Sequence, residues 1–69
     1  MYTGLIIHSK DSNADIWVET NYTGPVPNVG EIVTVRDDRR VVSRSFNFHH
    51  NYSSGEAVCV VRLVVEDVR

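Results

Sequence analysis

The sequence predicts an all-β domain, a five-stranded antiparallel small barrel, and three observations support this. Val, Ile, Thr and aromatic residues gather in five runs, which is typical of strands. The segments between these runs are rich in Gly, Pro, Asn, Asp and Ser and favour turns. No apolar period of 3.6 residues persists for ten residues, so helices are not expected. The five runs are residues 2–8, 14–20, 31–37, 40–48 and 57–66. An OB-like barrel and an open meander sheet are the alternatives.

The first two runs, YTGLIIH and ADIWVET, carry apolar side chains at alternate positions. Alternate residues of a strand point to opposite faces, so Leu5 and Ile7 are expected to point inward, as are Ile16 and Val18. Every linker in the chain is shorter than the dozen or more residues that a parallel crossover needs. We therefore expect antiparallel neighbours in meander order.

The segment GPVPNVG is predicted to be a loop that leads into the third strand. Pro25 and Pro27 lack the backbone N–H that a central strand donates. Val33 and Val35 then point inward, and residues 37–39 are predicted to form a tight turn, because an Asp carboxylate can accept hydrogen bonds from nearby backbone N–H groups.

The fourth run, RVVSRSFNF, is expected to place Phe46 and Phe48 in the core. Arg44 shares their parity, and burying an unpaired guanidinium is costly. We therefore expect a bulge or a strand break near residues 43–45. In the alternative, Arg40 and Arg44 point outward together with both rings, as cations and stacking rings do in small barrels that bind single strands.

The last run, AVCVVRLVVE, is apolar on both faces apart from Arg62, whereas a one-sided antiparallel strand alternates apolar with polar residues. Cys59, Val61, Leu63 and Val65 form its expected inner set. A loop folded over the outer face, or a bulge that resets the parity, is one explanation. The other is an apolar interface with a partner, anchored by Trp17. Its predicted residues are Trp17, Ile32, Val58, Val60, Arg62 and Val64, and Ile6 shares their parity.

A family resemblance is carried by P-N-V-G-E-I-V-T-V at 27–35, the charged turn that follows, R-V-V-S-R-S-F at 40–46 and the closing V-V-R-L-V-V. These stretches resemble the small SH3-like barrels found among short phage and prophage proteins, over about residues 25–66. The resemblance implies an architecture and a mobile-element origin. It implies no ligand and no catalytic residue.

Length and charge limit the function. The 69 residues are expected to form one domain, 1–69, with one core. The net charge of −2 argues against a general DNA coat. Charge is nevertheless uneven, because residues 36–52 hold four Arg and two Asp, a balance of +2, and the rest holds three basic and seven acidic residues, a balance of −4. A nucleic-acid site is thus an alternative, formed by Arg36, Arg39, Arg40 and Arg44.

Catalytic and metal-binding motifs are not found. The adjacent His49 and His50 point to opposite sides of an extended chain, and suitably spaced zinc partners are missing. Cys59 has no polar neighbour that would activate its thiol. We expect no enzyme, metal site, cofactor or small-molecule substrate.

The expected location is the cytoplasm, that of the host if the protein is phage-encoded. The start, MYTGLIIHSK, lacks the features of a signal peptide, and no apolar run approaches the ~18 residues of a membrane span. The leading hypothesis is a noncatalytic protein-interaction module, an adaptor or inhibitor of a host protein. A single-stranded nucleic-acid binder and a structural homo-oligomer, most simply a dimer, are the alternatives.

Overall fold

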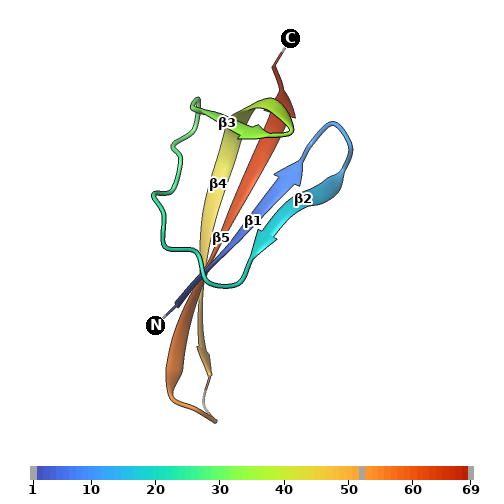
Figure 1. The fold of residues 1–69 in the computed structure, drawn as a ribbon. Helices are drawn as coiled ribbons and strands as arrows, with labels where there is room; N and C mark the ends of the chain where they lie inside the picture. The colour runs from blue at the N-terminus through green and yellow to red at the C-terminus, as the bar shows by residue number, and fades with distance from the viewer. Residues whose placement is uncertain (1, 52, 69) are drawn as a thin grey trace.

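Five strands make up the computed structural model, which describes residues 2–51 and 53–68, and no helix occurs in these residues (Figure 1). The strands are β1 (Tyr2–Ser9), β2 (Ala14–Glu19), β3 (Ile32–Val35), β4 (Asp37–Asn51) and β5 (Glu56–Asp67). The prediction of an all-β chain with five strands is therefore confirmed. The two long strands, β4 and β5, are consecutive in the chain and form one long hairpin, around which the sheet is built.

The sheet has the strand order β2-β1-β5-β4-β3, and it is mixed. Three neighbouring pairs are antiparallel, but β1 and β5 run parallel over Tyr2–Ser9 and Val58–Val65. The prediction of an entirely antiparallel meander was wrong at this pair. Short linkers exclude a parallel crossover only between consecutive strands, and β1 and β5 are separated by the rest of the chain.

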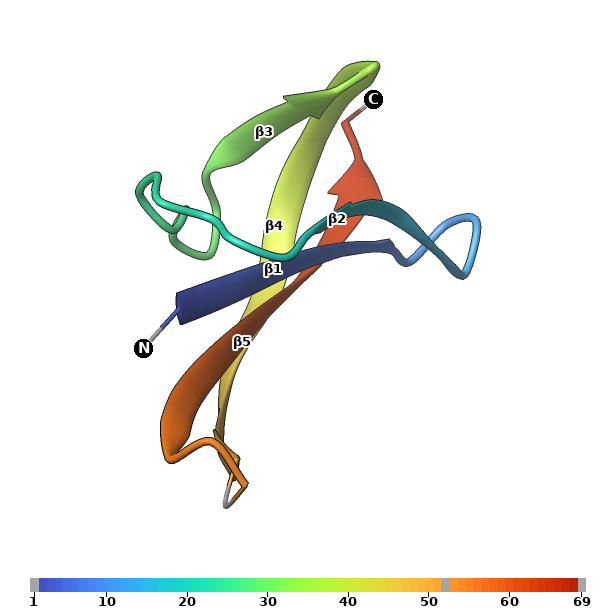
Figure 2. The ribbon, with the colours of Figure 1, turned by 60° about the horizontal axis from the view of Figure 1, so that its bottom comes forward.

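The sheet curls strongly but stays open, so it forms half of a barrel (Figure 2). β2 and β3 are its two edges, and within residues 2–51 and 53–68 they do not pair with each other. The predicted closed barrel is thus corrected to an open, curled sheet, while the SH3-like assignment stays a prediction. We call the inner side of this curl the concave face and the outer side the convex face.

The core lies on the concave face. Its buried apolar residues are Leu5, Ile7, Val41, Cys59, Val61, Leu63 and Val65. Leu5 pairs with Val61 and Ile7 with Leu63, so their side chains stand side by side on one face. The segment between β2 and β3 passes over this face, where Tyr22 and Val26 pack against the core. The predicted inner sets of β1 and β5 are confirmed.

One predicted inner residue of β2 is wrong. Val18 is 62% exposed, and it pairs with Ile6 on the convex face. The pairing of β1 with β2 shifts between Ile7 and His8, which places Trp17 opposite Ile7 on the concave face. Ile16 still packs against the core. A bulge changes which residues share a face, and this one separates Ile16 from Val18.

The turns also differ from the prediction. Arg36 alone joins β3 to β4, with a left-handed φ of 66°, and residues 37–39 already belong to β4. Thr34 donates a hydrogen bond to the Asp38 carboxylate across this turn, at 2.8 Å. The predicted bulge of β4 exists one residue earlier than expected, where the register shifts between Val41 and Ser43.

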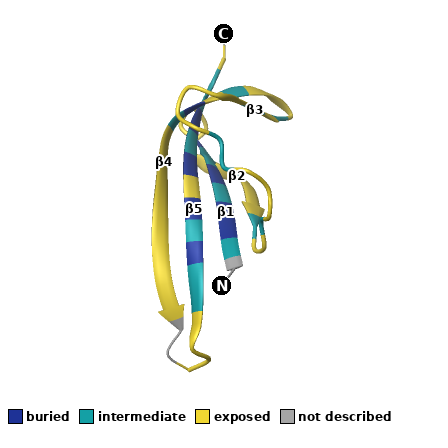
Figure 3. Cartoon of the chain, turned by 90° about the vertical axis from the view of Figure 1, so that its left-hand side faces the viewer, coloured by how far each residue is buried: buried dark blue, intermediate teal, exposed yellow. Residues whose placement is uncertain are grey.

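The molecule is elongated. Its principal extents are 46 × 22 × 18 Å, and its radius of gyration is 13.0 Å, against about 11 Å for a compact domain of this length. The cause is the far part of the β4–β5 hairpin, which projects beyond the other strands (Figure 3). We call residues 43–51 of β4 the β4 edge, because in the described chain only β5 pairs with them. Its side chains from 43 to 50 are exposed.

Candidate interaction surfaces

The convex face of the sheet carries a group of apolar residues in neighbouring strands. Register places them there, because Ile6 pairs with Val18 and with Arg62, and Gly4 pairs with Val60. The apolar members are Ile6, Val18, Val58, Val60 and Val64, which we call the convex patch. In the described chain no other element packs against this face, since the segment between β2 and β3 packs on the concave side. A domain is normally built from two packed layers, and here the second layer is missing.

A shallow hollow of about 210 Å³ lies in the part of the convex patch that is formed by Ile6, Val18, Val58 and Val60. Gly4 also lines it and lies opposite Val60 in the β1–β5 pair. A methyl group at Gly4 would meet Val60 Cγ2 at 3.8 Å, an ordinary contact, so packing does not demand glycine here. The hollow is lined mainly by carbon, which suits an apolar side chain from a partner.

Polar residues lie within and beside the convex patch. Arg62 is exposed within it, between Val60 and Val64 on β5 and opposite Ile6 on β1. His8 Nδ1 and Asp15 Oδ1 lie 2.9 Å apart across the β1–β2 pair, and this pair sits next to Val64. A protein interface combines an apolar core with a polar rim, and the His8–Asp15 pair lies at such a position.

Two of the six predicted interface residues lie elsewhere. Trp17 is on the concave face, where its indole N–H donates a hydrogen bond to Glu19 Oε1 at 3.0 Å and its ring lines an open hollow with Tyr22 and Pro27. Ile32 pairs with Arg40 at the β3 edge of the sheet, and β4 separates it from β5. The structure therefore brings together only Val58, Val60, Arg62 and Val64, and adds Ile6 and Val18 to them.

The four arginines of the predicted nucleic-acid site do not form one surface. Arg39 Nη1 is 2.7 Å from Asp67 Oδ1, and its Nε donates to the Val35 carbonyl at 3.2 Å. Arg40 points to the other face of the sheet, with Nη1 3.9 Å from Glu66 Oε1. The β4 bulge separates both from Arg44, which lies on the concave side.

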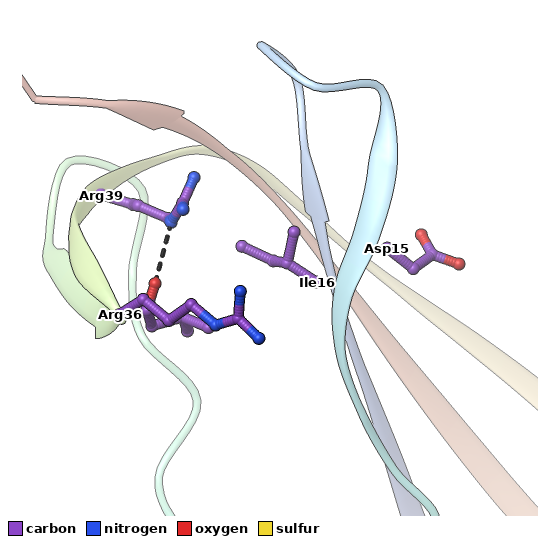
Figure 4. A pocket seen from close by; sticks show the side chains of 5 residues that line it. Asp15, Ile16, Arg36 and Arg39 are labelled. Atoms are coloured by element: carbon purple, nitrogen blue, oxygen red, sulfur yellow. Dashed lines mark hydrogen bonds between the residues drawn. The ribbon is translucent and has the colours of Figure 1, made fainter.

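Arg36 and Arg39 meet in a pocket at the open end of the half-barrel (Figure 4). Arg36 projects into it from the turn, and Ile16 faces both arginines from β2. Asp15 belongs to the same lining, but its carboxylate points away toward His8, its hydrogen-bond partner. Because Arg39 is held by Asp67, only Arg36 could offer its full charge to a ligand here.

The β4 edge carries two exposed aromatic residues. Phe46 is 46% exposed and Phe48 is 73% exposed, so the prediction that they belong to the core was wrong. They pair with the buried Val61 and Cys59, which places them on the concave side. The Arg44 guanidinium carbon lies 5.4 Å from the centre of the Phe46 ring, within cation–π range.

The physical reason for this exposure is the open sheet. The concave core ends where the segment between β2 and β3 leaves the hairpin, with Arg44 Nη1 3.4 Å from the Pro27 carbonyl oxygen. Beyond this point both rings stay exposed, with the Arg44 guanidinium over part of the Phe46 ring. The sequence carries no signal of this exposure, because the alternation of Phe46 and Phe48 with polar residues is also the pattern of a strand that is buried on one face.

Within residues 2–51 and 53–68, no group of three His, Cys, Asp or Glu side chains is arranged to hold a metal ion. Cys59 is a buried free thiol. The described chain has no helix that is long and apolar enough to cross a membrane.

Comparison with known proteins finds no matching family model, no matching curated protein and no matching solved structure.

Proposed function

We propose that the protein is a noncatalytic interaction module that binds a partner protein through the convex patch. The observation that carries this proposal is the single-layered sheet, in which Ile6, Val58 and Val60 surround a hollow that no other described element covers. Val18 is exposed and the other four members of the patch are half-buried, and a contiguous apolar surface that stays open to solvent marks interaction sites. The role as adaptor or inhibitor belongs to the same proposal.

The chemistry of the patch defines the partner. Branched aliphatic side chains without a buried charge recognise an apolar protrusion, and a single side chain could fill the hollow above Gly4. Arg62 within the patch and the His8–Asp15 pair beside it would orient the partner and influence its approach. The expected partner thus presents one or two apolar side chains within a polar surround.

The experiment compares the wild type with three variants, two in the convex patch and one outside it, as immobilised bait in an extract of the source cells. Val18→Lys places a charge in the convex patch at a residue that is 62% exposed, so little folding energy is at risk. Val29→Lys is the matched control, since Val29 is 57% exposed but lies in the segment between β2 and β3. Proteins retained by the wild type and the control are then purified and titrated.

We expect Val18→Lys to weaken binding of such a protein about tenfold or more, and Val60→Lys to do the same from the centre of the hollow. Circular dichroism and thermal unfolding verify that each variant is folded. Equal affinities for the wild type and both patch variants would contradict the proposal.

A further inference from the structure

The β4 edge is an unprotected strand edge of nine residues. Only β5 pairs with residues 43–51 among the described strands, whereas β3 pairs with the preceding part of β4, Asp37–Arg40. Every second residue of such a strand turns its backbone N–H and C=O away from the sheet, where they can pair with another strand. Proteins usually protect long edges with charged side chains, Pro or bulges. The sequence SRSFNFHHN has one such residue, Arg44 near its start, while residues 45–51 contain no Pro, Lys, Arg, Asp or Glu, and the bulge precedes the edge.

We infer that the β4 edge pairs with the β4 edge of a second copy of this chain, antiparallel and centred on Asn47, to make a two-fold symmetric dimer with one continuous ten-stranded sheet. This goes beyond the proposed function, because it uses a strand edge and not the convex patch.

The register follows from two requirements. In an antiparallel pair, directly opposite residues point to the same face, and the concave faces of both copies must lie on the same side of the joint sheet. One residue must therefore lie opposite its own copy across the two-fold axis. Residues 43–51 pair over their whole length only when the axis passes through their midpoint, Asn47. Residue 43 then lies opposite residue 51 of the other copy, and Ser45 lies opposite His49.

This register also places the aromatic rings favourably. Phe46 would lie opposite Phe48 of the second copy, twice by symmetry, on the concave side where both are exposed. Aromatic cross-strand pairs stabilise antiparallel sheets, and these pairs would cover two rings that are exposed within one chain. The two Arg44 side chains, six residues apart in register, would be about 20 Å from each other, so the two guanidinium groups do not directly oppose each other.

Symmetry gives a sharp cross-linking test. In a Cys59→Ala background, Asn47→Cys puts two thiols opposite each other across the axis, with Cα atoms about 4.5–5.5 Å apart, within the range that a disulfide bridges. Ser45→Cys is the matched control, because it lies on the same face and is equally exposed, yet its two copies would be about 14 Å apart. We expect rapid disulfide-linked dimer for Asn47→Cys on mild oxidation and little for Ser45→Cys. Equal rates for the two variants would overturn the register.

Sedimentation of the full chain over a range of concentrations tests the dimer itself. We expect a reversible dimer whose dissociation constant rises about tenfold or more in Phe48→Lys. Val68→Lys is the control, since Val68 is exposed at the opposite end of the hairpin and should leave the constant unchanged. A wild type that stays monomeric at the highest attainable concentration would overturn the proposal. So would a monomer that binds a single-stranded oligonucleotide through Arg44, Phe46 and Phe48, because nucleic acid would then occupy this surface.

Discussion

The β4 edge and β5 are two strands of one hairpin with opposite environments. Phe46 is 46% exposed and its partner across the ladder, Val61, is 1% exposed, while Phe48 is 73% exposed opposite Cys59 at 6%. All four side chains lie on the concave side. The difference arises because β5 has a strand on each side and β4, beyond its bulge, has a strand on one side only.

This comparison teaches that burial in a curled sheet depends on neighbouring strands more than on the size of the side chain. The two phenylalanines are larger than any core residue of β5, yet they stay exposed, because β1 flanks β5 on the side away from β4, and the segment between β2 and β3 packs against the core. Exposed rings on an unpaired edge contribute little to folding of one chain and are available for association.

The largest loss of stability is expected for a substitution at the centre of β5. Leu63 is completely buried, and Leu63→Ala should lower the free energy of unfolding by about 2–5 kcal/mol, since a cavity remains in the core. This approaches the whole stability of a domain of this size. Urea denaturation followed by circular dichroism measures the change.

A milder core variant allows the contribution of the core to stability to be measured if Leu63→Ala does not fold. Ile7→Val removes one methylene group beside Leu63 and should cost about 0.5–1.5 kcal/mol. Losses of unfolding free energy well below these two ranges, for both Leu63→Ala and Ile7→Val, would show that the concave core does not hold the fold together.

Much of the β5 side of this comparison is predictable from sequence. Alternation identifies Cys59, Val61, Leu63 and Val65 as the inner set, and the surplus valines between them identify the convex patch. Local pattern does not encode which distant strands meet, so the parallel pairing of β1 with β5 was missed. It also does not encode which edges remain open, and so Phe46 and Phe48 were assigned to the core.

The candidate site was predicted in part for a related reason. Val58, Val60 and Val64 share one strand, so their common face follows from a period of two. Trp17 was assigned to that face by the same rule, but the shift between Ile7 and His8 moves it to the concave side. A single extra residue in a strand exchanges the faces to which the following side chains point. No residue near Trp17 indicates that a bulge occurs there.

The next effect concerns the end of the hairpin opposite the β4 edge, where two neighbouring arginines differ. Arg39→Ala should cost about 1–3 kcal/mol, because the largely buried guanidinium makes a charged hydrogen bond to Asp67 and another to the Val35 carbonyl. Arg40→Ala should change stability by less than about 0.5 kcal/mol, since its contact with Glu66 is long and exposed. Urea denaturation of the two variants side by side tests this, and equal losses would contradict the assignment.

The smallest change in stability is expected at the β4 edge, where truncating a large side chain should cost less than truncating a small one. In dilute solution, where dimers dissociate, Phe48→Ala should alter the free energy of unfolding by less than about 0.5 kcal/mol, because the ring is mostly in solvent. Cys59→Ala, directly across the ladder, should cost more, about 1 kcal/mol, although it removes far fewer atoms, because its sulfur is buried. Denaturation at low protein concentration gives both values. A larger loss for Phe48→Ala would mean that the ring is packed within its own chain, and the β4 edge would then lose the exposed aromatic surface on which its pairing depends.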